Sequence, residues 1–130
     1  MKKILIVVGN YYPEISKELL VSAQSVIQNY KTDIIEAPGI FEIPILIAKN
    51  IENYDAAIAL GCVIKGETPH FEYISNACTN GIMKISINTK KPIGNGILTC
   101  LNKDQAIART NKGVEAAKAI LQVMKNEFRN

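Results

Sequence analysis

Short apolar runs alternate four times with segments of helical periodicity along this chain of 130 residues. The apolar runs cover residues 4–8, 33–37, 56–64 and 92–100, and the periodic segments cover residues 14–30, 43–51, 70–83 and 104–128. Strands that are apolar at nearly every position are typical of a parallel sheet buried on both faces. The alternation therefore predicts an α/β fold, a three-layer sandwich in which helices cover both faces of a four-stranded parallel sheet. A chain of this length is expected to form a single domain, residues 1–130.

Two details of the last periodic segment follow from its residue types. Asp104 is a good N-cap residue, so we expect the helix to begin there. Residues 111–113 contain Asn and Gly, which are poor helix formers, so an interruption is expected at this point.

The composition argues against several classes of protein. The net charge is +3 and no basic block is longer than two residues, whereas a nucleic-acid-binding protein usually carries a dense basic face. The apolar run 4–8 is shorter than the roughly 7–15 residue core of a secretion signal. No segment reaches the roughly 18–20 apolar residues of a membrane span. The three cysteines, Cys62, Cys78 and Cys100, are widely spaced in apolar surroundings, which favours reduced thiols in a cytoplasmic protein over disulfides or a zinc site.

Residues that can carry chemistry follow each predicted strand. The segments concerned are 9–13, 38–42, 65–70 and 98–100. Parallel sheets bind their ligands at the carboxyl ends of the strands. These segments would bring aromatic rings, a carboxylate, a Gly-Glu-Thr turn and the only histidine of the chain to one edge of the sheet. That combination indicates a site for an anionic substrate whose reaction needs proton transfer.

His70 is the strongest candidate for the proton-transfer group. Imidazole is the side chain that titrates nearest to neutral pH, and His70 follows the most buried predicted strand and a helix-opening Thr-Pro. The alternative is an exposed or packing histidine at a helix start. Just before it, Glu67 and Thr68 lie in a turn whose free N–H groups could hold a phosphate or carboxylate, or that simply caps the helix.

The remaining candidates are weaker when each is taken alone. Glu42 could bind the hydroxyls of a sugar or polyol, or be a first-turn acid favoured by the helix dipole. Tyr11 and Phe41 could cover a flat heteroaromatic ring or be packing residues. Arg109, with Lys112 nearby, could neutralise a phosphate dianion or be an exposed helix charge. Neither G-x-G-x-x-G nor G-x-x-x-x-G-K-[ST] occurs, so the fingerprints of dinucleotide and P-loop sites are missing.

Four motifs, in order along nearly the whole chain, resemble the lumazine synthase family. They are PGIFEIP (38–44), ALGCVIKGETPHFEYI (59–74), PIGNGILT (92–99) and NKGVEAA (111–117). The resemblance implies a transferase of riboflavin biosynthesis. Such an enzyme condenses 5-amino-6-(D-ribitylamino)uracil with 3,4-dihydroxy-2-butanone 4-phosphate to 6,7-dimethyl-8-ribityllumazine and releases phosphate. It implies no metal and no organic cofactor.

The resemblance also implies a role for individual residues. His70 corresponds to the general acid/base, and the phosphate-binding positions correspond to Glu67, Thr68 and Arg109. The substrate-binding positions correspond to Tyr11, Ile40, Phe41, Glu42, Cys62, Val63, Ile64 and Asn95. Among these, residues 40–42 would hold the ribityl chain, residues 62–64 the pyrimidine, and Tyr11 would stack on the pyrimidine beside Asn95. Because the family's sites lie between adjacent subunits, His70 and Arg109 would face the Asn95 region of a neighbour.

The chain departs from the family pattern at several positions. Ile40 stands where a small alanine is usual and would add bulk beside the ribityl chain, which it would then contact through its backbone. Asn95 stands where many members have phenylalanine. Only Thr110 separates Arg109 from residues 111–113, where many members carry a longer loop, and the first strand begins almost at the start of the chain. Both features favour a free homopentamer over an icosahedral shell.

Three other kinds of protein share parts of this pattern. A flavodoxin-like binding module would share the fold but would carry a Ser/Thr-rich phosphate loop after the first strand, where this chain has Asn10, Tyr11 and Tyr12. A receiver domain would need clustered acids there. The more serious alternative is a catalytically weak family member that acts as a flavin-binding, lumazine-binding or scaffold protein, which Ile40 and Asn95 could permit.

Overall fold

The computed structural model describes residues 2–126 and contains one sheet with helices on both of its faces. Its strands are β1 (Lys3–Gly9), β2 (Lys31–Ala37), β3 (Ala56–Ile64) and β4 (Ile93–Cys100), and its α-helices are α1 (Pro13–Val26), α2 (Ile43–Asn50), α3 (His70–Thr89), α4 (Lys103–Ala108) and α5 (Lys112–Lys125). The short 3₁₀ turns η1 (Ile40–Glu42) and η2 (Ile51–Asn53) flank α2. The strand order is β2-β1-β3-β4 and all pairs are parallel, which confirms the predicted three-layer fold.

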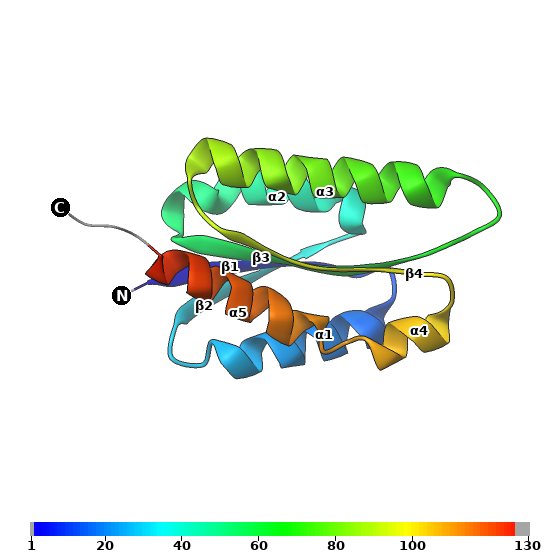
Figure 1. The fold of residues 1–130 in the computed structure, drawn as a ribbon, viewed down its shortest axis with the longest axis horizontal. Helices are drawn as coiled ribbons and strands as arrows, with labels where there is room; N and C mark the ends of the chain where they lie inside the picture. Colours follow the sequence, from blue (N-terminus) through cyan, green and yellow to red (C-terminus); the bar gives the residue numbers. More distant parts are fainter. Residues whose placement is uncertain (1, 127–130) are drawn as a thin grey trace.

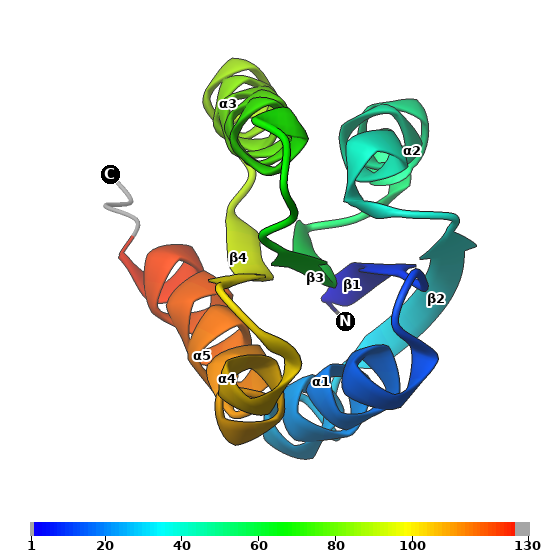
Figure 2. The same ribbon diagram turned by 90° about the vertical axis from the view of Figure 1, so that its right-hand side faces the viewer.

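The helices divide between the two faces of the sheet. Figures 1 and 2 show α2 and α3 on one face and α1, α4 and α5 on the other. Alternate residues of β1 supply the two cores, because successive side chains of a strand point to opposite faces. Ile4, Ile6 and Val8 pack toward α1 and α5, and Leu5 and Val7 pack toward α2 and α3. The two central strands are buried on both faces, as their continuous apolar sequences predict.

The carboxyl ends of the strands lie at one edge, where the predicted loops meet. Gly9 pairs with Ala37 at the end of β1 and β2, and Ile64 pairs with Cys100 at the end of β3 and β4. The loops that follow these strands therefore start side by side. All three cysteines are buried and free, which confirms their predicted place in the core. Within residues 2–126, no helix combines the length and the apolar character needed to cross a membrane.

Helix α3 is longer than the sequence pattern predicts. It continues to Thr89, whereas the periodicity predicts an end near Met83. Ile85 and Ile87 are β-branched and alternate with polar residues, which locally favours a strand. Packing prevails over this preference, because Ile82 and Ile85 lie three residues apart and both contact the core between α3 and the sheet.

The C-terminal helical segment differs from expectation at its start. Asn102, rather than Asp104, is the N-cap of α4, and its Oδ1 accepts a hydrogen bond of 2.9 Å from the backbone N–H of Gln105. Gln105 in turn accepts 2.8 Å from the N–H of Leu101, so two donors of the helix start are satisfied by this pair. The predicted interruption is present: α4 ends at Ala108 and α5 begins at Lys112. The expected end at Phe128 lies outside the described residues.

Candidate active site

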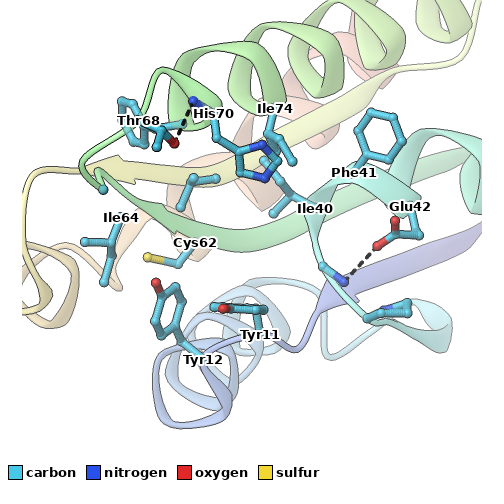
Figure 3. Close-up of a pocket in the computed structure, with 15 residues that line it drawn as sticks. Tyr11, Tyr12, Ile40, Phe41, Glu42, Cys62, Ile64, Thr68, His70 and Ile74 are labelled. Atoms are coloured by element: carbon cyan, nitrogen blue, oxygen red, sulfur yellow. Dashed lines mark hydrogen bonds between the residues drawn. The ribbon is translucent and has the colours of Figure 1, made fainter.

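A cavity of about 390 Å³ opens at the carboxyl ends of β1 and β3, beneath the first turns of α3 (Figure 3). Its walls come from the loop after β1, from residues 38–42, from the end of β3 and from the start of α3. The lining residues are Tyr11, Tyr12, Pro38, Gly39, Ile40, Phe41, Glu42, Cys62, Val63, Ile64, Gly66, Thr68, His70, Phe71 and Ile74. Most of the predicted site residues are therefore brought together by one cavity.

Two aromatic rings at this cavity are open to solvent. Tyr11 is 72% exposed and Phe41 is 59% exposed, although both are large apolar side chains that usually seek burial. The rings of Tyr11 and Tyr12 meet edge to face, with centroids 4.9 Å apart and planes 79° apart. Tyr12 also packs against the core, so its ring links Tyr11 to the body of the protein. Tyr11 thus keeps a free face that can stack on a flat heteroaromatic ring.

The loop that carries the two tyrosines is anchored at its first residues. The buried hydroxyl of Ser16 donates a hydrogen bond of 2.6 Å to the carbonyl of Gly9 at the end of β1. The N–H of Asn10 donates 2.9 Å to the carbonyl of Ala37 at the end of β2. The strand ends therefore fix the direction in which the loop leaves the sheet.

Glu42 and Ile40 belong to the wall of the cavity that residues 38–42 form, and their side chains make different contacts. Oε1 of Glu42 accepts a hydrogen bond of 3.1 Å from the N–H of Gly39, so the carboxylate is oriented by its own turn (Figure 3). Its second oxygen makes no hydrogen bond with the described residues and can accept from a ligand hydroxyl. The side chain of Ile40 is only 5% exposed and packs against Gly61. Its bulk is therefore directed mostly into the core.

His70 stands at the first position of α3, and Figure 3 shows its ring over the cavity. The side chain is exposed, and its backbone N–H donates a long hydrogen bond of 3.4 Å to Oγ1 of Thr68. The start of a 20-residue helix carries free N–H groups and a positive partial charge, which favour an anion. An imidazole and a helix start that favours anions are thus adjacent, although Glu67 itself does not line the cavity.

Burial keeps the thiol of Cys62 and the hydroxyl of Tyr12 protonated near pH 7. Burial, reinforced by the neighbouring Cys100, raises the pKa of the Cys62 thiol to about 12. Burial first, and then the neighbouring Tyr11 and Cys62, raise the pKa of Tyr12. Cys62 is therefore a protonated, apolar floor residue rather than a nucleophile. Within residues 2–126, no group of three or more His, Cys, Asp or Glu side chains could hold a metal ion.

Arg109 and Asn95 lie outside this cavity. Arg109 lines a second cavity of about 380 Å³ on the other side of the end of β4, together with Lys112 and Glu115. Asn95 is exposed on the edge strand β4, and its Oδ1 accepts a hydrogen bond of 3.0 Å from the N–H of Ile97. Within one subunit, the structure therefore does not bring the predicted phosphate-binding arginine to the histidine.

Six residues that line the main cavity were not among the predicted site residues: Tyr12, Pro38, Gly39, Gly66, Phe71 and Ile74. Ile74 had a usable signal, because it follows His70 by four residues and so shares its helix face. Tyr12 and Phe71 are direct neighbours of predicted site residues. Adjacent residues usually point in different directions, so sequence alone gave no reason to include them.

Comparison with known proteins gives one consistent result. The family described as 6,7-dimethyl-8-ribityllumazine synthase matches residues 1–127. A 6,7-dimethyl-8-ribityllumazine synthase of Corynebacterium kroppenstedtii is 40% identical over 128 residues, which is 92% of this chain and 80% of the relative. The enzyme of the same name from Bartonella bacilliformis is 45% identical over 129 residues, 91% of this chain and 85% of the relative. The one from Ruthia magnifica is 37% identical over 139 residues, 94% of this chain and 83% of the relative.

Proposed function

The chain belongs to the 6,7-dimethyl-8-ribityllumazine synthase family, and from that premise we propose which of its residues bind and convert the substrates. It is a transferase of riboflavin biosynthesis that condenses 5-amino-6-(D-ribitylamino)uracil with 3,4-dihydroxy-2-butanone 4-phosphate. One observation carries the assignment of the site: the main cavity combines two open aromatic faces, an oriented carboxylate and an imidazole at a helix start.

The pyrimidine ring binds between the aromatic side chains and the end of β3. Tyr11 stacks on the ring, and residues 62–64 provide backbone groups along its edge. The free oxygen of Glu42 accepts from the ribityl hydroxyls near Phe41. The buried side chain of Ile40 supports this placement, because it leaves the backbone of residue 40 as the group nearest the ribityl chain.

The reaction moves a proton at each step, and His70 relays these protons. The amine of the pyrimidine attacks the ketone, and loss of water gives a Schiff base. Elimination then releases inorganic phosphate, and closure of the second ring expels a second water. The N–H groups of the turn 66–69 stabilise the departing phosphate together with a cationic side chain. Holding both substrates in attack geometry supplies a large share of the acceleration.

The cationic side chain comes from a neighbouring subunit. Arg109 and His70 line separate cavities of one subunit, so a phosphate that binds to both must lie between two copies of the chain. A homopentamer with a site at each contact satisfies this requirement. Arg109 and Asn95 of one subunit then face the His70 cavity of the next, whereas the sequence resemblance implied that Arg109 and His70 belong to the same subunit. We retain a free pentamer rather than a shell as part of the proposal, because the turn between Arg109 and Lys112 is short.

Dilution tests the shared site. The expected result is that specific activity falls in step with the pentamer as the protein is diluted, as followed by analytical ultracentrifugation and product absorbance. Activity that persists unchanged in a verified monomer would contradict the shared site. The test leaves the assignment of the reaction itself untouched, because the reaction is measured at high protein concentration.

Formation of lumazine from the two substrates tests the function. The wild-type protein should form the product, and Arg109→Ala should raise KM for the butanone phosphate far more than KM for the pyrimidine. A folded oligomer that forms no product would instead indicate a binding or scaffold role.

We also propose a single domain, in agreement with the single sheet, and a cytoplasmic location, which the three buried free thiols support.

A further inference from the structure

We propose that Ser22, on α1, is a positioning residue for Arg109 and Lys112. This inference rests on the proposed function, in which Arg109 binds the substrate phosphate; Lys112 lines the same cavity as Arg109. Ser22 lines neither cavity, so it acts on the reaction only through the turn that carries the cations. Figure 2 shows α1 lying beside α5, with α4 close by on the same face of the sheet.

The hydroxyl of Ser22 reaches the turn directly. Its Oγ lies 2.9 Å from the carbonyl oxygen of Thr110, a residue 88 positions later in the sequence. The same Oγ lies 3.1 Å from the carbonyl of Leu19 within α1. A hydroxyl has one proton to donate, and the shorter distance favours the bond to Thr110. The carbonyl of Thr110 also accepts 3.3 Å from the N–H of Gly113, so it is bonded from both α1 and α5.

The start of α5 rests on the same part of α1. A Cβ atom added to Gly113 would overlap Oγ of Ser22 and the carbonyl oxygen of Leu19. This close approach is possible only because residue 113 has no side chain. The turn is therefore held against α1 at two points, the carbonyl of Thr110 and the backbone of Gly113.

The orientation of the Arg109 and Lys112 side chains depends on the turn that contains Thr110. Arg109 is the C-cap of α4, a helix of only six residues, and its side chain is exposed. Lys112 is the first residue of α5 and is half-buried. A hydrogen bond to Thr110, which lies next to Arg109, orients the backbone from which the guanidinium extends. Without the bond, both cations would sample more positions and hold phosphate less tightly.

Steady-state kinetics of the intact oligomer test the proposal. Ser22→Ala should raise KM for the butanone phosphate, and the inhibition constant of inorganic phosphate, about three- to tenfold, the size of one neutral hydrogen bond. KM for the pyrimidine and kcat should stay within about twofold. Ser22→Thr should restore the wild-type values, because it keeps a hydroxyl. Ser22→Cys, which keeps the size but donates weakly, should behave like Ser22→Ala and replaces it if that variant fails to fold.

Ser25 provides a matched control on the same helix. Its hydroxyl donates 2.6 Å to the carbonyl of Ser22 but does not contact the turn, so Ser25→Ala should leave all constants unchanged. Equal changes in both KM values, or an effect of Ser25→Ala as large as that of Ser22→Ala, would mean a purely structural role and overturn the proposal. Arg109→Ala distinguishes a failure of the inference on Ser22 from a failure of the proposed function. If it raises KM for the phosphate substrate while Ser22→Ala does not, the inference on Ser22 fails and the function stands; if Arg109→Ala has no effect, the phosphate assignment itself fails.

Discussion

The Cγ2 methyl of Ile40 lies 2.6 Å from the point where a Cβ atom on Gly61 would stand. Real Cβ atoms do not approach other heavy atoms so closely, so a branched side chain at residue 40 requires glycine at residue 61. The contact joins the 3₁₀ turn beside the candidate ribityl site to strand β3. It explains how the chain accommodates an isoleucine at a position that lines the candidate site.

Gly61→Ala should therefore destabilise the protein by about 1–3 kcal/mol, the usual effect of overpacking in a core. Ile40→Ala alone should destabilise it by about 2–5 kcal/mol through the cavity that it leaves. The double variant should be more stable than the sum of the two effects, because the new methyl at residue 61 fills part of that cavity. Urea denaturation of the four proteins measures the coupling. Strictly additive effects would show that the two residues do not press on each other.

The fold was largely predictable because its strands carry their own signal. The runs around β1 and β3 are apolar at nearly every position, and only a sheet buried on both faces explains them. The length of α3 was not predictable, because Ile85 and Ile87 favour a strand locally, whereas the packing of Ile82 and Ile85 against the core keeps this segment helical. The N-cap at Asn102 was also missed, since Asn102 and Asp104 are both good caps and only the contact with Gln105 distinguishes them.

The site was predictable where its residues follow the strand ends, and it was not predictable at Arg109. Tyr11, Glu42 and His70 follow different strands of one sheet, and topology alone brings their loops to one edge. The identity of the substrates came from the resemblance of the motifs to a known family, not from the topology. Arg109 comes at the same edge but faces another cavity, and the direction of a short helix such as α4 cannot be read from residue types.

His70→Asn should lower kcat by at most about 100-fold, the lower end of the range for general acid–base catalysis. The reason is the exposure of the ring, which lets water replace part of its proton relay, together with the share of catalysis that comes from positioning two substrates. KM for both substrates should change little. Single-turnover formation of lumazine measures the effect on chemistry directly. An unchanged single-turnover rate would remove His70 from the proton relay.

The two tyrosines at the cavity should respond differently to substitution. Tyr11→Ala should raise KM for the pyrimidine about three- to tenfold, the usual size of one aromatic stacking contact. Tyr11→Phe keeps the ring and should bind normally. Tyr12→Phe should also be nearly silent, since the raised pKa of Tyr12 keeps its hydroxyl protonated and it takes no part in proton transfer. Tyr12→Ala should weaken pyrimidine binding by removing the ring that contacts Tyr11 edge to face. A silent Tyr11→Ala would exclude stacking on this ring.

The buried thiols should make the protein less stable in alkali. Burial raises the pKa of the Cys62 and Cys78 thiols from the ordinary value of 9.0 to about 12, so the folded state holds these protons more tightly than the unfolded chain. Their contribution is complete below pH 9 and is lost as the pH rises toward 12, with a slope of at most about 1.4 kcal/mol per pH unit for each thiol. Urea midpoints between pH 8 and 10 should therefore fall more steeply for the wild type than for the variant Cys62→Ala, Cys78→Ala. Parallel slopes for the two proteins would mean that the thiols titrate alike in the folded and unfolded states.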